Sequence, residues 1–159
     1  MSNSYFKPIT LSLLLAAGTL ATAHADSEGA RVAPLPKYQQ ECAACHMAYP
    51  PGMLPAATWQ RMMGALKQHY GTDASLDDAS AREISSWLKA NAGTYQRVSE
   101  QPPQDRITKS AWFLREHRAG EVSPEVWKRA SVGSPSNCAA CHGRAAQGSF
   151  SERDIKIPR

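Results

Sequence analysis

The sequence predicts an all-α protein built from two small helical domains. Segments with helical periodicity, bounded by capping residues and glycines, follow one another through most of the chain. No stretch has the regular alternation of a convincing strand. A mostly polar segment, 97–106, contains Pro102 and Pro103 and separates two groups of helices. The flanking sequences of the two groups do not match, so we expect two unlike domains, 26–100 and 101–159, rather than a duplication.

Residues 1–25 have the pattern of a cleaved export signal. One lysine precedes a short apolar run, and the segment closes with Ala23-His24-Ala25, an A-x-A cleavage pattern. The apolar run is about a dozen residues long, shorter than the roughly 20 residues that a membrane-spanning helix needs. We therefore expect cleavage after Ala25, export to the periplasm and a soluble mature chain, 26–159, without a membrane span.

The charge of the mature chain argues against a nucleic-acid partner. The sequence has 18 Lys and Arg and 14 Asp and Glu, and one lysine lies in the predicted signal, which leaves 17 basic against 14 acidic residues. These charges are interspersed, so no basic patch for nucleic acid is expected. Each predicted domain is small and buries little apolar surface by itself, so we expect something besides side chains to fill the core.

The helices of the first half are predicted from apolar periodicity and from their end signals. We expect helices over 36–47, 56–70 and 78–91. Asp77 or Asp78 is the expected cap of the third helix, because a carboxylate accepts hydrogen bonds from the free amides of the first turn.

In the second half we expect a helix over 108–118, with Thr108 as its cap. A shorter helix is expected from Ser123-Pro124 onward, because serine suits the cap and proline suits the first helical position. A last helix is expected to be capped by Ser136 or Asn137.

All four cysteines lie in two copies of one motif, C-A-A-C-H. The spacing C-x-x-C-H is typical of covalent haem c attachment, because two thiols add to the two vinyl groups of one porphyrin and the next imidazole becomes an axial ligand of the iron. We therefore expect two covalently bound haem c groups. The thioether cysteines would be Cys42, Cys45, Cys138 and Cys141, and the first iron ligands would be His46 and His142.

Three other uses of four cysteines fit the sequence less well. Two disulfides would not require a histidine directly after each pair. A C-x-x-C redox motif normally occurs once, near a βαβ pattern that this sequence lacks. The two cysteine pairs of a zinc ribbon lie about 15–20 residues apart, whereas Cys45 and Cys138 are 93 positions apart.

The number of histidines matches two haems that each have two histidine ligands. Outside the predicted signal the chain has four histidines, of which the motifs use two. His69 shares the apolar stripe of the second predicted helix, and His117 ends the fourth. Chain order favours pairing His46 with His69 and His117 with His142, although a crossed arrangement stays open.

Methionine is the competing ligand for the first haem, and it would raise the reduction potential. Met53 lies in a proline-rich loop of the kind that delivers an axial methionine, so it is the best rival of His69. Met62 and Met63 more often fill a core, and Met47 directly follows the first motif. The second half contains no methionine.

The chain resembles the soluble dihaem cytochrome c family, called DHC, over nearly all of residues 36–159. Besides the two motifs, the likeness lies in Leu54-Pro55 to Trp59, His69-Tyr70-Gly71 with Asp73-Ala74-Ser75-Leu76, Trp112-Phe113 with Arg115-Glu116-His117, Ser134-Pro135-Ser136-Asn137 and Ile157-Pro158-Arg159. The resemblance implies an N-terminal domain like class I cytochrome c, a distinct C-terminal haem domain and bis-histidine ligation of both haems. It also implies an oxygen-binding monohaem cytochrome as electron acceptor and a membrane cytochrome b as donor.

Two irons that each have two protein ligands favour electron transfer over catalysis, because no coordination position is left for a substrate. The sequence therefore predicts a non-enzymatic relay. A haem enzyme or gas-binding protein with one open or labile site is the alternative, with Arg115 and Glu116 beside His117 as imaginable acid–base groups. A haem subunit of a larger oxidoreductase complex is a third hypothesis.

Overall fold

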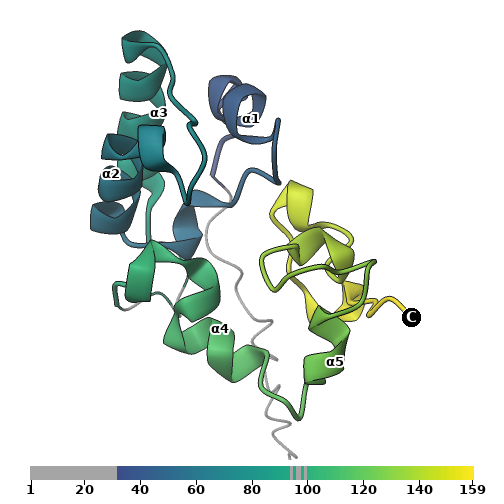
Figure 1. Cartoon of the computed structure of the whole chain (residues 1–159). Helices are drawn as coiled ribbons and strands as arrows, with labels where there is room; N and C mark the ends of the chain where they lie inside the picture. Colours follow the sequence, from purple (N-terminus) through teal and green to yellow (C-terminus); the bar gives the residue numbers. More distant parts are fainter. Residues whose placement is uncertain (1–31, 94, 96–97, 99) are drawn as a thin grey trace, which may run out of the picture.

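The computed structural model of the chain describes residues 32–93, 95, 98 and 100–159 (Figure 1). The predicted signal, 1–25, lies outside these residues. Within them the regular structure consists of α-helices and 3-10 turns and contains no strand, only the isolated bridges His69–Thr72 and His142–Ile155. The all-α prediction is therefore confirmed. None of the helices in the described part of the chain has the length and apolar character needed to cross a membrane.

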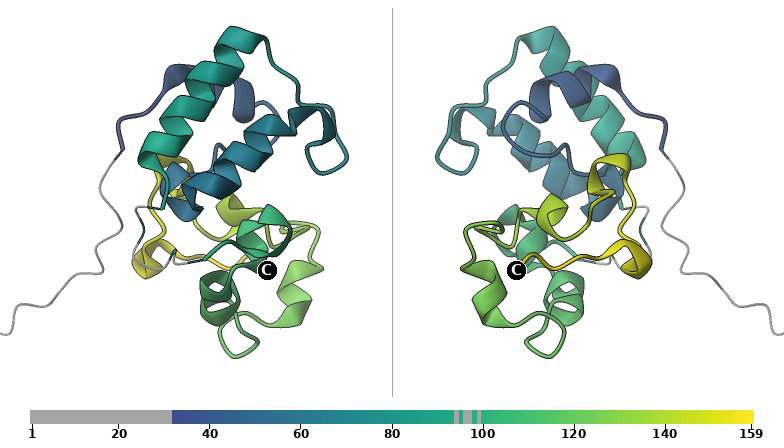
Figure 2. Two further views of the ribbon diagram at one scale, coloured as in Figure 1. Left: turned by 90° about the vertical axis from the view of Figure 1, so that its left-hand side faces the viewer. Right: turned by 90° about the vertical axis from the view of Figure 1, so that its right-hand side faces the viewer.

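Three α-helices form most of the first half, and they are α1 (Pro36–Cys42), α2 (Ala56–Gly64) and α3 (Asp78–Asn91). Two 3-10 turns accompany them, η1 (Pro51–Met53) and η2 (Leu66–Gln68). Helices α2 and α3 lie side by side, and α1 crosses near α3 (Figures 1 and 2).

The second half is made of short helices and turns, which Figure 2 shows on the other side of the molecule from α1 to α3. In chain order they are η3 (Pro103–Asp105), η4 (Ile107–Lys109), α4 (Ala111–Glu116), α5 (Pro124–Trp127), η5 (Cys138–Ala140), η6 (Ala145–Gln147) and η7 (Glu152–Asp154). Its buried apolar residues are small in number and separated along the chain: Phe113, Val126, Val132 and Ala145.

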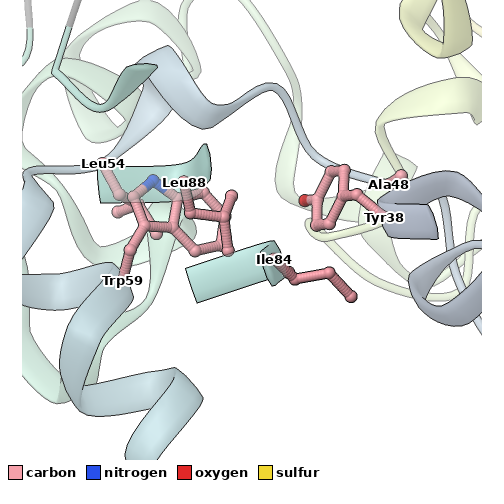
Figure 3. Packing of buried hydrophobic residues seen from close by; sticks show 6 residues of the cluster. All are labelled: Tyr38, Ala48, Leu54, Trp59, Ile84 and Leu88. Atoms are coloured by element: carbon pink, nitrogen blue, oxygen red, sulfur yellow. The ribbon is translucent and has the colours of Figure 1, made fainter. Parts of the chain in front are cut away.

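The main apolar core belongs to the first half (Figure 3). Its buried members are Tyr38, Ala48, Leu54, Trp59, Ile84 and Leu88. Ile84 and Leu88 occupy one face of α3 at i and i+4 and are 0% and 1% exposed. The indole nitrogen of Trp59 donates to the carbonyl of Pro51 at 2.7 Å, which ties the 3-10 turn of the proline-rich loop to α2.

Helix α3 has the bounds that the sequence predicts. Of the two candidate caps, Asp77 is the correct one, because its carboxylate accepts hydrogen bonds from the amides of Ala79 and Ser80, both at 3.0 Å. These hydrogen bonds hold the pKa of Asp77 below its ordinary value. The capping residue and the apolar face therefore indicate the same helix, which is why the bounds of α3 could be predicted from the sequence.

The first two helices are shorter than expected. Helix α1 ends at Cys42, so Cys45 and His46 lie on the turn that follows rather than on a helix. Helix α2 ends at Gly64, where the high conformational freedom of glycine weakens a helix by about 1 kcal/mol relative to alanine. The chain continues as the 3-10 turn η2, and His69 follows that turn instead of extending the apolar stripe of α2.

The expected caps of the second half also need correction. Ser110, not Thr108, caps α4, and its hydroxyl accepts from the amide of Phe113 at 3.3 Å. Ser123 and Pro124 begin α5 as predicted, although the Ser123 side chain makes no capping hydrogen bond. The segment after Asn137 is only a 3-10 turn, and Asn137 donates its side-chain amide to the carbonyl of Val132 at 2.9 Å rather than capping.

The segment that follows the prolines is held against the first half. The guanidinium of Arg61 donates to both carboxylate oxygens of Asp105, at 2.6 and 3.1 Å. The Tyr70 hydroxyl donates to the backbone carbonyl of Asp105 at 2.8 Å, and Arg106 stacks over the Tyr70 ring at 4.1 Å. Asp105 has a left-handed backbone with φ of 55°, which these contacts help to hold.

Ile107 also packs against the core of the first half, so contacts with that half continue past residue 101. The division into domains 26–100 and 101–159 stays a prediction.

Replacing Ile84 with alanine tests the core. The side chain is fully buried, so we expect Ile84→Ala to lower the free energy of unfolding by about 2–5 kcal/mol. Ser86→Ala on the exposed side of the same helix is the control, with a change of at most about 0.5 kcal/mol. Both values come from denaturant unfolding of the holoprotein, and equal effects of the two variants would contradict this core assignment.

The Arg61–Asp105 pair makes stability depend on pH. Its hydrogen bonds lower the pKa of Asp105 below the ordinary 3.8, so the stabilisation is present above that value and is lost as the pH falls through the lowered pKa. We expect Asp105→Asn to lower Tm by roughly 1–4 °C at pH 7 and by less below pH ~4. Glu125→Gln, which removes a fully surface ion pair with Lys128, is the control and should leave Tm unchanged. If Asp105→Asn lowered Tm by the same amount at neutral and at acidic pH, the assignment of this pH dependence to the Arg61–Asp105 pair would be contradicted.

Candidate functional site

The first motif, residues 42–46, begins at the last residue of α1 and continues into the turn that follows the helix. Cys42 is half-buried at the last helical position, and Cys45 and His46 are exposed on the turn. The Nδ1 atom of His46 lies 2.7 Å from the carbonyl oxygen of Met47. Because a carbonyl only accepts, Nδ1 carries the hydrogen and Nε2 keeps the lone pair that binds a metal.

His69 faces His46 across this site. Their ring centroids are 6.1 Å apart and their planes differ by 28°. Burial, then the nearby His46 and Arg106, lower the pKa of His69, which favours the neutral imidazole that a metal requires. The backbone on both sides of His69 is fixed, since its amide donates to Leu66 and its carbonyl accepts from Thr72.

The second motif lies on the turn η5 and the residues after it. Cys138, Cys141 and His142 are all half-buried. A backbone hydrogen bond of 2.9 Å from Lys156 to the carbonyl of Cys141 ties the C-terminal tail to this motif. The motif is thus held in place by a segment that follows it by about a dozen residues.

His117 ends α4 and faces His142. The two ring centroids are 6.2 Å apart, with planes at 67°. The Nδ1 atom of His117 lies 3.0 Å from the carbonyl of Phe113, and its ring stacks on the Phe113 ring at 4.0 Å and 14°. As at His46, the carbonyl contact assigns the hydrogen to Nδ1 and leaves Nε2 for a metal.

Both imidazole pairs have the separation that one bound iron requires. Metal–imidazole nitrogen bonds are about 2.0–2.1 Å long and the ring centroid lies roughly 1.1 Å beyond the nitrogen, so two axial imidazoles have centroids about 6.2–6.4 Å apart. The observed separations are 6.1 and 6.2 Å. Each pair therefore fits one iron whose remaining ligands a porphyrin would supply.

The cysteines fit thioether attachment. No disulfide joins any two of the four cysteines. Burial raises the pKa of Cys42 and of Cys138 to about 11, with Glu41 adding to the effect at Cys42. These surroundings disfavour a charged thiolate and suit an uncharged thioether.

The rival methionines are part of the packing of the first half. Met53 is buried in η1 at 3% exposure, and the ring that faces His46 is that of His69. Met62 and Met63 pack against the core, and the Met62 sulfur lies 3.4 Å from the Tyr70 hydroxyl oxygen.

Two residues near the sites carried no clear signal in the sequence. The i, i+4 spacing of Phe113 and His117 could have indicated their stacking on α4. Tyr49 lies 5.1 Å from the His46 ring and donates its hydroxyl to the carbonyl of Ser136, 87 positions away, which no local pattern predicts. Burial and the nearby Cys138 raise the pKa of Tyr49 to about 12, so its hydroxyl stays protonated.

Comparison with known proteins identifies the family. The dihaem cytochrome c family matches residues 38–150. The chain is similar to the crystal structure of DHC from Rhodobacter sphaeroides, with 47% identity over 76% of this chain and 100% of that chain and a TM-score of 0.65. It is also similar to the dihaem cytochrome c of Shewanella baltica, with 35% identity over 77% of this chain and 92% of that one and a TM-score of 0.67. No curated protein sequence matches it.

The paired imidazoles, the two C-x-x-C-H motifs and these similarities agree. The chain belongs to the dihaem cytochrome c family, a family of electron-transfer proteins, and it carries two covalently bound haem c groups.

Proposed function

We propose that this protein is a periplasmic electron relay in which both haems are closed by two histidines. His46 and His69 would ligate the first iron, and His142 and His117 the second. The observation that carries the proposal is the pair of imidazole separations, 6.1 and 6.2 Å, each of which accommodates one iron between two rings. The same distances favour pairing within each half over a crossed arrangement.

The bound haems supply a one-electron couple, ferric to ferrous. The chain's own contribution is to hold two imidazoles at each iron so that neither oxidation state requires rearrangement. His46 and His117 are oriented by their Nδ1 contacts to carbonyl oxygens, which also increase the basicity of Nε2. His69 is held by its backbone and by the Tyr70–Asp105 contact beside it.

The same geometry argues for a carrier rather than an enzyme. A site with two protein ligands on the iron leaves no position for substrate. Arg115 and Glu116, the imaginable acid–base groups next to His117, form an ion pair with each other at 3.1 Å. Their charges thus neutralise one another near the surface.

Electrons would enter or leave where a haem edge reaches the surface. Cys45 is exposed, so the haem edge that it would hold would lie near solvent. Contact with partners would be transient and guided by charge. From the family resemblance, the acceptor would be a small oxygen-binding monohaem cytochrome and the donor a membrane cytochrome b. Export to the periplasm rests on the signal pattern of residues 1–25.

Low-temperature EPR of the oxidised holoprotein tests the ligation. Each imidazole raises the energy of the iron d orbital perpendicular to its ring, so near-parallel rings split the two d orbitals and strongly crossed rings leave them nearly equal. From the plane angles of 28° and 67° we expect two different low-spin signals, an ordinary rhombic one and one of much larger anisotropy.

A large high-spin EPR signal would refute the closed relay and would favour the gas-binding or enzymatic alternative. Carbon monoxide binding is a second test for a free coordination position on the iron. Adding the gas to the reduced protein should leave the haem absorption spectrum unchanged, because neither iron has such a position.

Single ligand variants test the pairing. We expect His69→Ala to convert only the rhombic signal to high spin and to allow the first haem to bind carbon monoxide. His117→Ala should do the same to the other signal alone. Met53→Leu is the matched control and should change neither signal, since the buried thioether would only be exchanged for an apolar side chain of similar volume. Loss of the rhombic signal in Met53→Leu would instead identify methionine as the ligand, and a His69→Ala change confined to the second haem would indicate crossed pairing.

A further inference from the structure

Tyr49 joins the surroundings of the two haem motifs. It follows His46 by three positions, and its ring lies 5.1 Å from the His46 ring with planes at 35°. Its hydroxyl donates to the carbonyl oxygen of Ser136 at 2.7 Å. One side chain of the first half thus contacts a proposed iron ligand of its own haem and the backbone just before the second motif.

The Ser136 carbonyl is part of the structure that holds the second motif. The same oxygen accepts the amide of Cys138 at 3.0 Å, and the Cys138 sulfur lies 3.6 Å from it. Cys138 is the first attachment cysteine of the second haem. The hydroxyl of Tyr49 and the amide of Cys138 therefore meet on one oxygen atom, two residues from the thioether sulfur.

Tyr49 is also anchored on the side of the first half. Its backbone carbonyl accepts the hydroxyl of Tyr38 at 2.7 Å. Tyr38 is 3% exposed, belongs to the main core, and lies 5.0 Å from the Trp87 ring. The contact from Tyr49 to Ser136 is thus built on the rigid part of the first half. By comparison, the contacts of Arg61 and Tyr70 with Asp105 hold the connecting segment and do not reach the second motif.

We infer that Tyr49 is a positioning residue that couples the two haem centres. It sets how the second motif lies against the first haem. It also supplies a short route between the two sites: a ring contact from His46 to Tyr49, then hydrogen bonds from the Tyr49 hydroxyl and the Cys138 amide to the shared Ser136 carbonyl. This inference rests on the proposed two-haem relay. One electron passes between the irons, one of which is oxidised and the other reduced. No covalent bond changes, and the phenol keeps its proton and its own electrons.

The test compares a side-chain hydrogen bond that reaches the second motif with one that stays between α2 and α3. Tyr49→Phe keeps the ring beside His46 and removes only the bond to Ser136. Ser85→Ala, the control, removes the hydroxyl that accepts from the side-chain amide of Gln60 at 3.1 Å. The holoprotein is reduced by one electron with a photochemical donor, and exchange between the haems is followed by absorption. We expect exchange between the haems to be slower in Tyr49→Phe, because the bond that holds the second motif against Tyr49 is lost, and to be unchanged in Ser85→Ala.

Two further measurements keep the result interpretable. Hydrogen exchange of the Cys138 amide should become faster in Tyr49→Phe and stay unchanged in Ser85→Ala. Tyr49→Leu, which also removes the ring, should slow electron exchange more than Tyr49→Phe does. The inference would be overturned if both Tyr49 variants kept the electron-exchange rate and the Cys138 amide protection of the wild type. The EPR spectrum of the wild type tests the proposed relay separately. High-spin iron in that spectrum would refute the relay, independently of the results for the Tyr49 variants.

Discussion

The proposed function places one constraint on this fold: two imidazole rings must face each other at the distance that a single iron between them would set. The pairs His46–His69 and His142–His117 have ring separations of 6.1 and 6.2 Å, which fit this constraint. Regular structure ends close to all four histidines, at a helix end, after a 3-10 turn or on a turn of a motif.

The two halves hold their histidines with different kinds of packing. The first half has a contiguous core in which Ile84 and Leu88 are almost completely buried, so its histidines project from a packed scaffold. The second half has four separated buried apolar residues and mostly 3-10 turns. Its distal ligand candidate, His117, is oriented by stacking on Phe113 and by the Phe113 carbonyl. A small half of this kind depends strongly on the group that its cysteines hold.

The helix bounds and caps predicted from the sequence were correct where a capping residue and the apolar periodicity agreed. They were wrong where the prediction rested on only one of these signals. Helix α3 has the predicted bounds because Asp77 caps it and Ile84 and Leu88 share its buried face. Helix α2 was expected to continue to Tyr70 on apolar periodicity alone, but Gly64 ends it. Thr108 was a plausible cap by residue type, yet the backbone turns again before Ser110 does the capping.

The sequence by itself determined that the chain attaches two haems and which four cysteines would hold them, because C-x-x-C-H places all the required groups within five consecutive residues. It also determined that four histidines outside the predicted signal are available as iron ligands. Tertiary structure decided which histidine faces which, at what angle between the rings, and that Tyr49 reaches Ser136. These are contacts between residues from 23 to 87 positions apart in the chain, and their geometry is set by the packing of whole elements, which no local pattern encodes.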